Sequence, residues 1–224
     1  MTPEATIRPA GRPPLPATAL VLAGGRGCRM GENKLYTKVD GAFLLSRLLA
    51  KLAVCFSATL LCVGAGEAEQ AAALLSPIPE RFGASFAEDR APGRGPLEGL
   101  RQGLAAMRTE WGFLLGVDMP ALREDVVRAM WSSIPPGTEV AAPRIDGRLT
   151  ALHAFYGKTC LPLVDAAQEN APKTARGGAR IMSFYETARL HIVEEEIFSG
   201  LPDYRKSFEN YNTKKELGDL LTHI

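Results

Sequence analysis

Apolar residues along this chain occur in two patterns, short continuous runs and longer runs with helical spacing. Residues 17–23 form a short apolar run that stops at two glycines, which is typical of a strand buried on both faces of a sheet. In residues 43–55 the leucines recur at helical spacing, which predicts an amphipathic helix. The two patterns then alternate, with strands predicted at 59–63, 84–87 and 113–117 and helices at 67–75, from residue 96, and at about 124–131.

This alternation of strand and helix predicts a single α/β domain with a doubly wound, mostly parallel sheet flanked by helices. The second half of the chain is less regular. Its pattern predicts strands at 139–143, 152–156 and 189–193 and helices at 160–168 and 214–221. The Pro-rich residues 1–16 cannot build a helix or a central strand, so we expect a mobile tail there and the folded domain at residues 17–224.

Composition narrows the class of protein. A chain of 224 residues with 46% hydrophobic residues is long enough for one full core. With 26 basic and 25 acidic residues, it lacks the basic excess expected of a protein that binds nucleic acid or a membrane surface. The sequence shows no apolar run near the roughly 18 residues of a membrane span and no secretory signal. The cysteines and histidines lack metal-ligand spacing, so we expect His153, His191 and His223 in the core or on the surface rather than at a metal site. From these features together we expect a soluble, cytoplasmic protein.

The loop at residues 24–34, directly after the first predicted strand, is rich in glycine. Glycines let the backbone approach an anion closely and turn its N–H groups toward it. Arg26, Arg29 and Lys34 add positive charge to the same loop. The P-loop ending and the dinucleotide fingerprint G-x-G-x-x-G are both absent. A surface turn would also use glycines, but three cations in the same loop favour phosphate binding.

Two further segments, one after a strand and one at the start of a helix, carry groups suited to binding a metal ion or an anion. Asp118 follows a buried strand, where one carboxylate fits the ligand demand of Mg²⁺, although it would equally well cap the next helix. Residues 95–97 (G-P-L) begin a helix whose N-terminal amides favour an anion. Gly99 and Gly103, four residues apart on that helix, allow close packing against either the sheet or a ligand.

Four segments together resemble one family. Residues 22–34 (L-A-G-G-R-G-C-R-M-G-E-N-K) resemble the signature loop of the molybdenum cofactor guanylyltransferases, within the nucleotidyltransferase superfamily. Residues 89–100 resemble its D…G-P-L-x-G segment, residues 117–120 its D-M-P, and residues 208–213 its F-x-N-x-N-T. The segments stand in family order from residue 20 to about residue 220. The resemblance implies a Rossmann-like nucleotidyltransferase fold.

The resemblance also implies roles for individual residues. Arg29 and Lys34 would hold phosphates, Asp118 would bind Mg²⁺, and these three would carry the catalytic role. Leu22, Ala23 and Gly24 would contact the base and ribose, Asp89 the nucleotide, and Asn210 and Asn212 the pterin or the floor of the site. The full set implied to bind nucleotide or pterin is Leu22, Ala23, Gly24, Gly25, Lys34, Asp89, Gly95, Pro96, Leu97, Asn210 and Asn212.

The implied reaction is Mg²⁺-dependent transfer of GMP from GTP to the terminal phosphate of molybdopterin or the molybdenum cofactor, with release of pyrophosphate. The attacking phosphate is already ionised, so charge neutralisation and alignment are needed rather than a protein nucleophile. The resemblance also implies transient contact with other cofactor-assembly proteins. No partner that is a nucleic acid or a membrane is expected.

One departure from the family concerns the base. Many members carry an asparagine after the second strand that helps read guanine, whereas this chain has Gly64-Ala65-Gly66-Glu67 there. Backbone groups around residues 64–66 would then have to read the base. Gly24-Gly25 favours guanine, because the related CTP-dependent branch usually has L-A-A-G at this point. Two alternatives stay open: a cytidylyltransferase that uses CTP on the same pterin, and a nucleotide-binding accessory protein without transfer activity.

Overall fold

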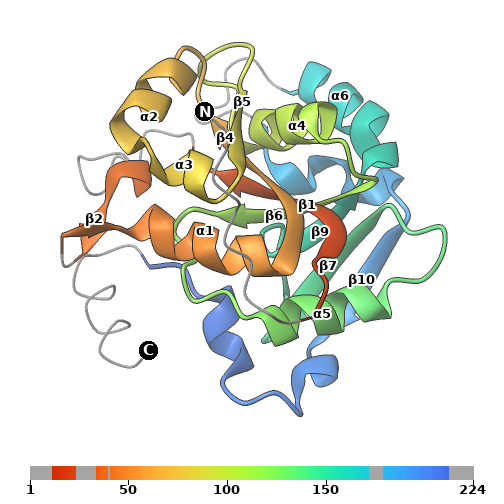
Figure 1. The fold of residues 1–224 in the computed structure, drawn as a ribbon. Helices are drawn as coiled ribbons and strands as arrows, with labels where there is room; N and C mark the ends of the chain where they lie inside the picture. Colours follow the sequence, from red (N-terminus) through yellow and green to blue (C-terminus); the bar gives the residue numbers. More distant parts are fainter. Residues whose placement is uncertain (1–11, 24–33, 40, 172–178, 212–224) are drawn as a thin grey trace.

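The computed structural model describes residues 12–23, 34–39, 41–171 and 179–211, and a twisted sheet runs through their centre (Figure 1). The strands lie in the order β10-β7-β9-β6-β1-β4-β5, and β8 pairs with β7. Their bounds are β1 (Leu15–Leu22), β4 (Phe56–Val63), β5 (Ala84–Glu88), β6 (Trp111–Gly116), β7 (Val140–Ile145), β8 (Arg148–Leu149), β9 (Ala154–Gly157) and β10 (Leu190–Glu194). The short strands β2 (Lys38–Val39) and β3 (Ala42–Phe43) pair separately.

Most strand pairs in the main sheet are parallel, as the alternating pattern predicts. β1 pairs in parallel with β4 and β6, β4 with β5, and β7 with β10. β9 is the exception among the central strands, because it runs antiparallel to both β6 and β7. Asp146 and Gly147, both with positive φ, close a two-residue turn between β7 and β8. The prediction of a mostly parallel α/β sheet is therefore confirmed.

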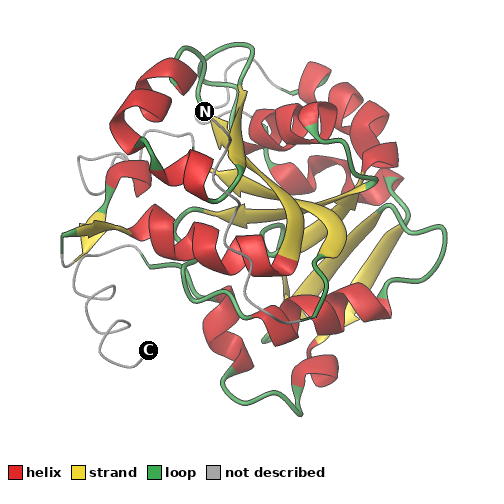
Figure 2. Ribbon diagram, viewed as in Figure 1, coloured by secondary structure: helices red, strands yellow, loops and turns green. Residues whose placement is uncertain are grey.

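Helices cover both faces of the sheet (Figure 2). One face shares a core with α1 (Leu44–Cys55), α2 (Ala68–Leu75), α3 (Ile78–Arg81) and α5 (Glu124–Ser133), and the other with α4 (Pro96–Ala106) and α6 (Leu161–Glu169). Short 3-10 turns connect the rest: η1 (Lys34–Tyr36), η2 (Lys158–Cys160), η3 (Ile181–Thr187), η4 (Glu195–Phe198) and η5 (Tyr204–Phe208). Along β1, Ala19 and Val21 belong to the first core and Leu20 to the second, as strand alternation requires.

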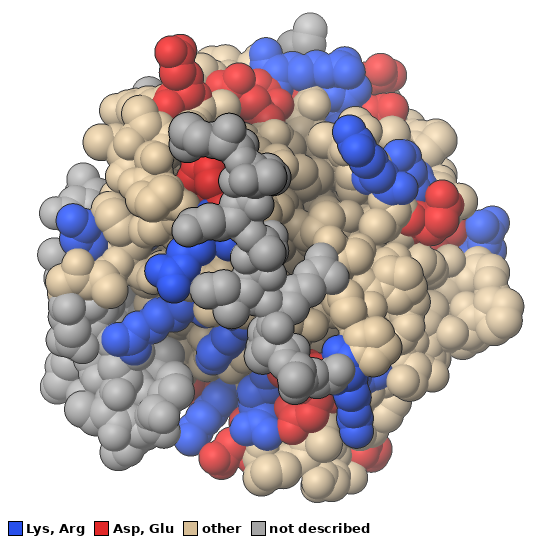
Figure 3. Space-filling model, viewed as in Figure 1, with Lys and Arg blue, Asp and Glu red and all other residues tan. Residues whose placement is uncertain are grey.

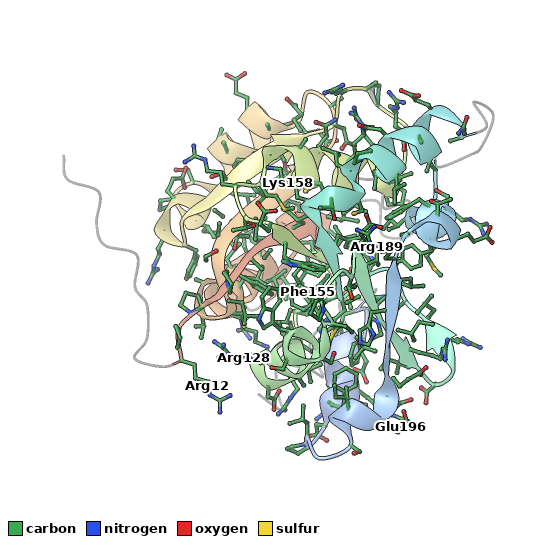
Figure 4. The ribbon with its side chains drawn as sticks, turned by 90° about the vertical axis from the view of Figure 1, so that its right-hand side faces the viewer. Arg12, Arg128, Phe155, Lys158, Arg189 and Glu196 are labelled. Carbon is green, nitrogen blue, oxygen red and sulfur yellow. The ribbon has the colours of Figure 1, made fainter. Side chains whose placement is uncertain are left out.

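Aromatic rings fill the middle of the first core. Phe155 of β9 points into the centre of the molecule (Figure 4), with its ring centroid 4.7 Å from that of Phe113 and 5.3 Å from that of Trp131. Phe56 stacks on Phe113 with centroids 5.1 Å apart. This packing explains why β4 begins at Phe56, directly after α1, rather than at residue 59 as predicted.

Other predicted bounds also need correction. β1 begins at Leu15, whose side chain is buried, so the strand starts two residues before the predicted residue 17. Its pairing with β4 is irregular between Leu15 and Thr18, and this irregularity accommodates Pro16. β9 begins at Ala154 rather than residue 152, because His153 has a φ of +58° that strand backbone does not allow. The predicted helix at 214–221 lies outside the described residues.

Close packing of α4 on the sheet answers one question that the sequence left open. A Cβ atom added to Gly99 would lie 2.6 Å from Leu22 Cδ2, and one added to Gly103 would lie 3.0 Å from Leu20 Cδ1. Both glycines therefore serve the contact between α4 and β1. This contact brings the first turn of α4 beside the carboxyl end of β1, where open parallel sheets bind ligands.

Charged side chains are unevenly placed on the face shown in Figure 3. Lysine and arginine side chains gather to the left of and below the centre, whereas aspartate and glutamate side chains lie mainly near the top and the bottom. None of the helices in the described part of the chain has the length and apolar content needed to span a membrane.

Candidate functional site

The four parallel strands β6, β1, β4 and β5 are neighbours, and their carboxyl ends form one edge. Backbone pairing continues past the strands along this edge. Ala23 N–H donates to Cys62 O at 2.8 Å, Val117 N–H to Leu22 O at 3.1 Å, and Asp89 N–H to Val63 O at 3.0 Å. The residues after each strand are therefore held in fixed positions. β6 and β5 are three strand spacings apart, so the edge is about 14 Å wide.

Asp118 lies at one end of this edge, after β6. Its Oδ2 accepts a hydrogen bond from Lys34 Nζ at 2.6 Å, and the two half-buried side chains form an ion pair. Lys34 begins η1, which follows the glycine-rich loop in the chain. The structure thus brings together two residues, 84 positions apart, that the sequence assigned to phosphate and metal binding. We call Lys34, Gly116, Asp118 and Tyr211 the Asp118 side.

Gly116 determines how the Asp118 carboxylate lies. A Cβ atom on Gly116 would collide with Asp118 Oδ1, so the carboxylate folds back over the glycine. Met119 N–H donates to Gly116 O at 3.1 Å and closes the turn between the two residues. Any side chain at position 116 would displace the carboxylate. Nothing in the sequence singles out Gly116, because a glycine at a strand end is also common without such a contact.

The Asp118 side fits a magnesium ion shared with a substrate. Mg²⁺ is usually held by one or two carboxylates together with waters and substrate phosphates. Asp118 supplies one carboxylate, with a cation already beside it. No group of three or more His, Cys, Asp or Glu side chains that would enclose a metal occurs among the described residues. The arrangement suits an ion that depends on phosphate ligands rather than a closed protein site.

The segment at residues 207–211 is fixed against the chain that follows β6. Tyr211 N–H donates to Asp118 O at 2.9 Å, and Arg123 N–H donates to Ser207 Oγ at 2.9 Å. The exposed Asn210, one of the two predicted pterin-binding asparagines, directly precedes Tyr211 and is therefore held close to Asp118. The other predicted asparagine, Asn212, lies outside the described residues.

His153 packs against this segment from the interior of the protein. Its ring is fully buried, lies 4.4 Å from the ring of Phe208, and has Nε2 3.4 Å from Ser207 Oγ. Burial lowers the pKa of His153 to about 3. The imidazole is therefore neutral at physiological pH, and its full burial confirms the prediction that His153 lies in the core or on the surface of the protein, here in the core.

Asp89 lies at the opposite end of the edge, after β5. Its Oδ1 is buried and accepts no hydrogen bond from the described residues. Burial, followed by the charges of Glu98, Glu67 and Glu88, raises the pKa of Asp89 to about 7. The carboxylate thus lies among other carboxylates without a cation bound to it in the described part of the chain. We call Gly64, Glu67, Asp89 and Glu98 the Asp89 side.

Glu98, in the first turn of α4, is a buried carboxylate that sequence reasoning missed. Its Oε1 accepts hydrogen bonds from Gln102 Nε2 at 2.7 Å and from Arg90 N–H at 3.3 Å. Arg94 and Arg101 form ion pairs with it at 3.7 and 3.5 Å. A glutamate in the first turn usually stays exposed and interacts with the helix dipole, so the sequence gives no signal of this burial.

The beginning of α4 is used mainly by the fold. Gly95 has a φ of +80°, and Pro96 takes the first helical position, where a missing N–H costs nothing. The Leu97 side chain is fully buried in the second core, and its N–H donates to Ala179 O at 3.4 Å. A nucleotide contact by residues 95–97 stays a prediction. The predicted phosphate-loop residues Gly24, Gly25 and Arg29 lie outside the described residues.

Comparison with known proteins shows the family to which the chain belongs. Residues 19–190 match the family model of the MobA-like NTP transferase domain. A relative from Methanosarcina mazei, described as a probable molybdenum cofactor guanylyltransferase, is 31% identical over 209 residues, which cover 92% of this chain and 90% of the relative. A relative from Pelotomaculum thermopropionicum with the same description is 29% identical, with 91% of each chain covered.

Solved structures show the same fold. The crystal structure of molybdopterin-guanine dinucleotide biosynthesis protein A from Archaeoglobus fulgidus superposes with a TM-score of 0.72 at 21% identity, covering 92% of this chain and 100% of the other. A 4-diphosphocytidyl-2C-methyl-D-erythritol synthase from Anaerococcus prevotii, at 11% identity and a TM-score of 0.60, shares the fold. The family model covers well over half of the chain, and the resemblance found in the sequence is confirmed. The chain belongs to the MobA-like NTP transferase family and is a nucleotidyltransferase.

Proposed function

We propose that this protein transfers GMP from GTP to the terminal phosphate of molybdopterin, or of its molybdenum-loaded form, and releases pyrophosphate. The observation that carries the proposal is the contact between Lys34 and Asp118 at the carboxyl ends of the parallel strands. This contact joins a phosphate-binding cation to a metal-binding carboxylate. The description of the relatives as molybdenum cofactor guanylyltransferases supports the choice of nucleotide and acceptor.

In this reaction, an oxygen of the acceptor phosphate forms a bond to the α-phosphorus of GTP, and the bond from that phosphorus to the bridging oxygen breaks. Pyrophosphate leaves with the electron pair. The acceptor is already an anion, so the protein needs no nucleophile of its own. Bound Mg²⁺ would supply charge neutralisation on the phosphates, held to the protein by Asp118.

The residues of the chain divide the remaining tasks. Lys34 and Arg29 hold the triphosphate, so that charge repulsion between acceptor and donor is reduced. Leu22, Ala23 and Asp89 position the nucleoside along the edge of the sheet. Asn210 and Asn212 orient the pterin beside Asp118. Alignment of two bound reactants in this way accounts for a large part of the rate of such reactions.

The reaction would take place in the cytoplasm, within one domain that begins with β1. Other proteins of cofactor assembly would deliver the pterin or collect the dinucleotide through transient contact. Neither nucleic acid nor membrane is required as a partner.

The missing asparagine at Gly64–Gly66 motivates a second candidate, transfer of CMP from CTP to the same pterin. Release of pyrophosphate, measured with Mg²⁺ and molybdopterin and with GTP or CTP as donor, separates the two. We expect release with GTP and little with CTP, and none without the pterin. Release with CTP alone would support the second candidate. Nucleotide binding without any pyrophosphate release would instead indicate an accessory protein that lacks transfer activity.

A further inference from the structure

The turn after β4 is closed by a glutamate side chain. Glu67 N–H donates to Gly64 O at 3.1 Å, and Gly64 N–H in turn donates to Glu67 Oε2 at 3.1 Å. The half-buried carboxylate lies directly over Gly64, because a Cβ atom there would be within 3.0 Å of Glu67 Oε1 and Oε2. The amide of Gly64, one of the backbone groups expected to read the base, is therefore already occupied by Glu67.

Glu67 is also close enough to act electrostatically on two residues of the same edge. Its charge contributes to the raised pKa of Asp89 from one direction and to that of Tyr36, in η1, from another. Burial is the larger cause in both cases. The geometry agrees, because Ala68 N–H, next to Glu67 in the chain, donates to Glu88 Oε1 at the end of β5 at 3.2 Å. Glu67 therefore lies on the same side of the site as Asp89.

The two carboxylates of Glu67 and Asp89 lack the cations that Glu98 has. Arg94 and Arg101 both pair with Glu98, whereas neither Glu67 nor Asp89 has an ion pair with a described residue. Asp89 Oδ1 has no hydrogen-bond donor there either. Carboxylate oxygens accept hydrogen bonds, and N–H donors on a bound ligand would favour the ionised form of Asp89. This part of the site therefore suits a ligand edge that carries adjacent N–H donors.

We infer that Glu67, together with Asp89, reads the base of the nucleotide and selects guanine, in place of the asparagine that this chain lacks. The inference rests on the proposed function. Guanine presents the N1–H and the N2 amino group side by side, both donors. Cytosine presents two acceptors beside its single amino group. These acceptors would face the carboxylate oxygens unfavourably, because both sides would lack a donor. A site built to accept hydrogen bonds discriminates strongly against a ligand that lacks the donors.

The test is calorimetric titration of the full-length protein with GTP and with CTP, each with Mg²⁺. The variants are Glu67→Gln, Glu67→Ala and the control Glu69→Gln, which changes an exposed glutamate two positions further on, in α2. We expect the wild type and Glu69→Gln to prefer GTP. Both Glu67 variants should bind GTP roughly 10- to 100-fold more weakly, with CTP affinity nearly unchanged, because a hydrogen bond to a charged group is lost only with guanine.

The ratio of GTP to CTP affinity separates a reading role from a structural one. If Glu67 only braced the turn, its variants would weaken both nucleotides alike, and the unchanged ratio would overturn the inference. A wild-type preference for CTP would also overturn it, while leaving nucleotidyl transfer intact. Absence of binding of either triphosphate to the wild type would instead contradict the proposed function itself.

Discussion

On the Asp118 side of the site, a lysine ammonium lies 2.6 Å from the carboxylate; on the Asp89 side, the carboxylate oxygen Oδ1 is buried with no described donor. Both aspartates follow parallel strands of the same sheet and lie on the same edge. They differ in what surrounds them. Asp118 has Lys34 as a partner, whereas Asp89 has Glu67, Glu88 and Glu98 close enough to raise its pKa.

This difference shows how one edge can hold the two ends of a nucleotide. On the Asp118 side, Lys34 and Asp118 carry opposite charges and pair with each other. A phosphate could take over the pairing with Lys34 and a metal ion the pairing with Asp118, so that neither charge would be left buried without a partner. The Asp89 side is acidic and partly desolvated, which repels phosphate and attracts neutral N–H donors. Under the proposed function, this charge pattern would orient the triphosphate toward Asp118 and the base toward Asp89.

Removal of the carboxylate at Asp118 should have the largest effect. Asp118→Ala takes away the one protein ligand assigned to Mg²⁺, so we expect turnover to fall on the order of a thousandfold, with the fold intact. The measurement is pyrophosphate release at saturating GTP, with circular dichroism to follow the fold. Near-normal turnover in a folded variant would contradict the assignment of Asp118 to the metal.

Removal of the cation on the same side should have an intermediate effect. Lys34→Ala eliminates a charge-assisted hydrogen bond to phosphate, so we expect GTP to bind roughly 10- to 100-fold more weakly. Binding of guanosine, which has no phosphates, should change little. Lys38→Ala, at an exposed lysine four positions further on that lies over the Phe43 ring, is the matched control for loss of charge. Equal weakening of GTP and guanosine would show that Lys34 acts through the fold rather than on phosphate.

The two sides also differ in how far the sequence reveals them. Lys34 and Asp118 belong to motifs that are visible in the chain, and the alternation of strands and helices predicts a parallel sheet whose strand ends share one edge. The acidic surroundings of Asp89 depend on tertiary packing. Glu98 is fully buried because α4 packs closely on β1 through Gly99, and no local pattern marks a glutamate in a first helical turn as buried.

The same distinction applies to the fold. Helical spacing of apolar residues and buried strand runs predict α1, α4, α5 and the parallel strands, because each pattern is local. The antiparallel direction of β9 depends on its pairing with both β7 and β6, and β6 lies far from β9 in the sequence. The left-handed backbone of His153 likewise follows from packing of its ring between Phe113 and Phe208. Periodicity carries no information on either feature.

The smallest effect we expect concerns stability on the Asp89 side. The pKa of Asp89 is raised from 3.8 to about 7, so the folded state holds this proton more tightly than the unfolded state. Ionisation of Asp89 therefore lowers stability as pH rises from about 4 to about 7, and the whole loss is present above pH 7. Asp89→Asn removes the loss. The Tm of this variant should exceed that of the wild type by more at pH 8 than at pH 5. We expect the excess to grow by roughly 2–4 °C between the two pH values, the shift that about 1 kcal/mol produces in a chain of this size.

Thermal unfolding of both proteins at the two pH values measures this difference, and His153 titrates alike in both. Asp125→Asn is the matched control, because Arg123 lowers the pKa of Asp125 and its ion pair is fully formed from pH 5 to pH 8. The Tm change of that variant should be the same at both pH values. An equally constant difference for Asp89→Asn would mean that the Asp89 carboxylate is compensated in solution, and the contrast between the two sides of the site would not hold.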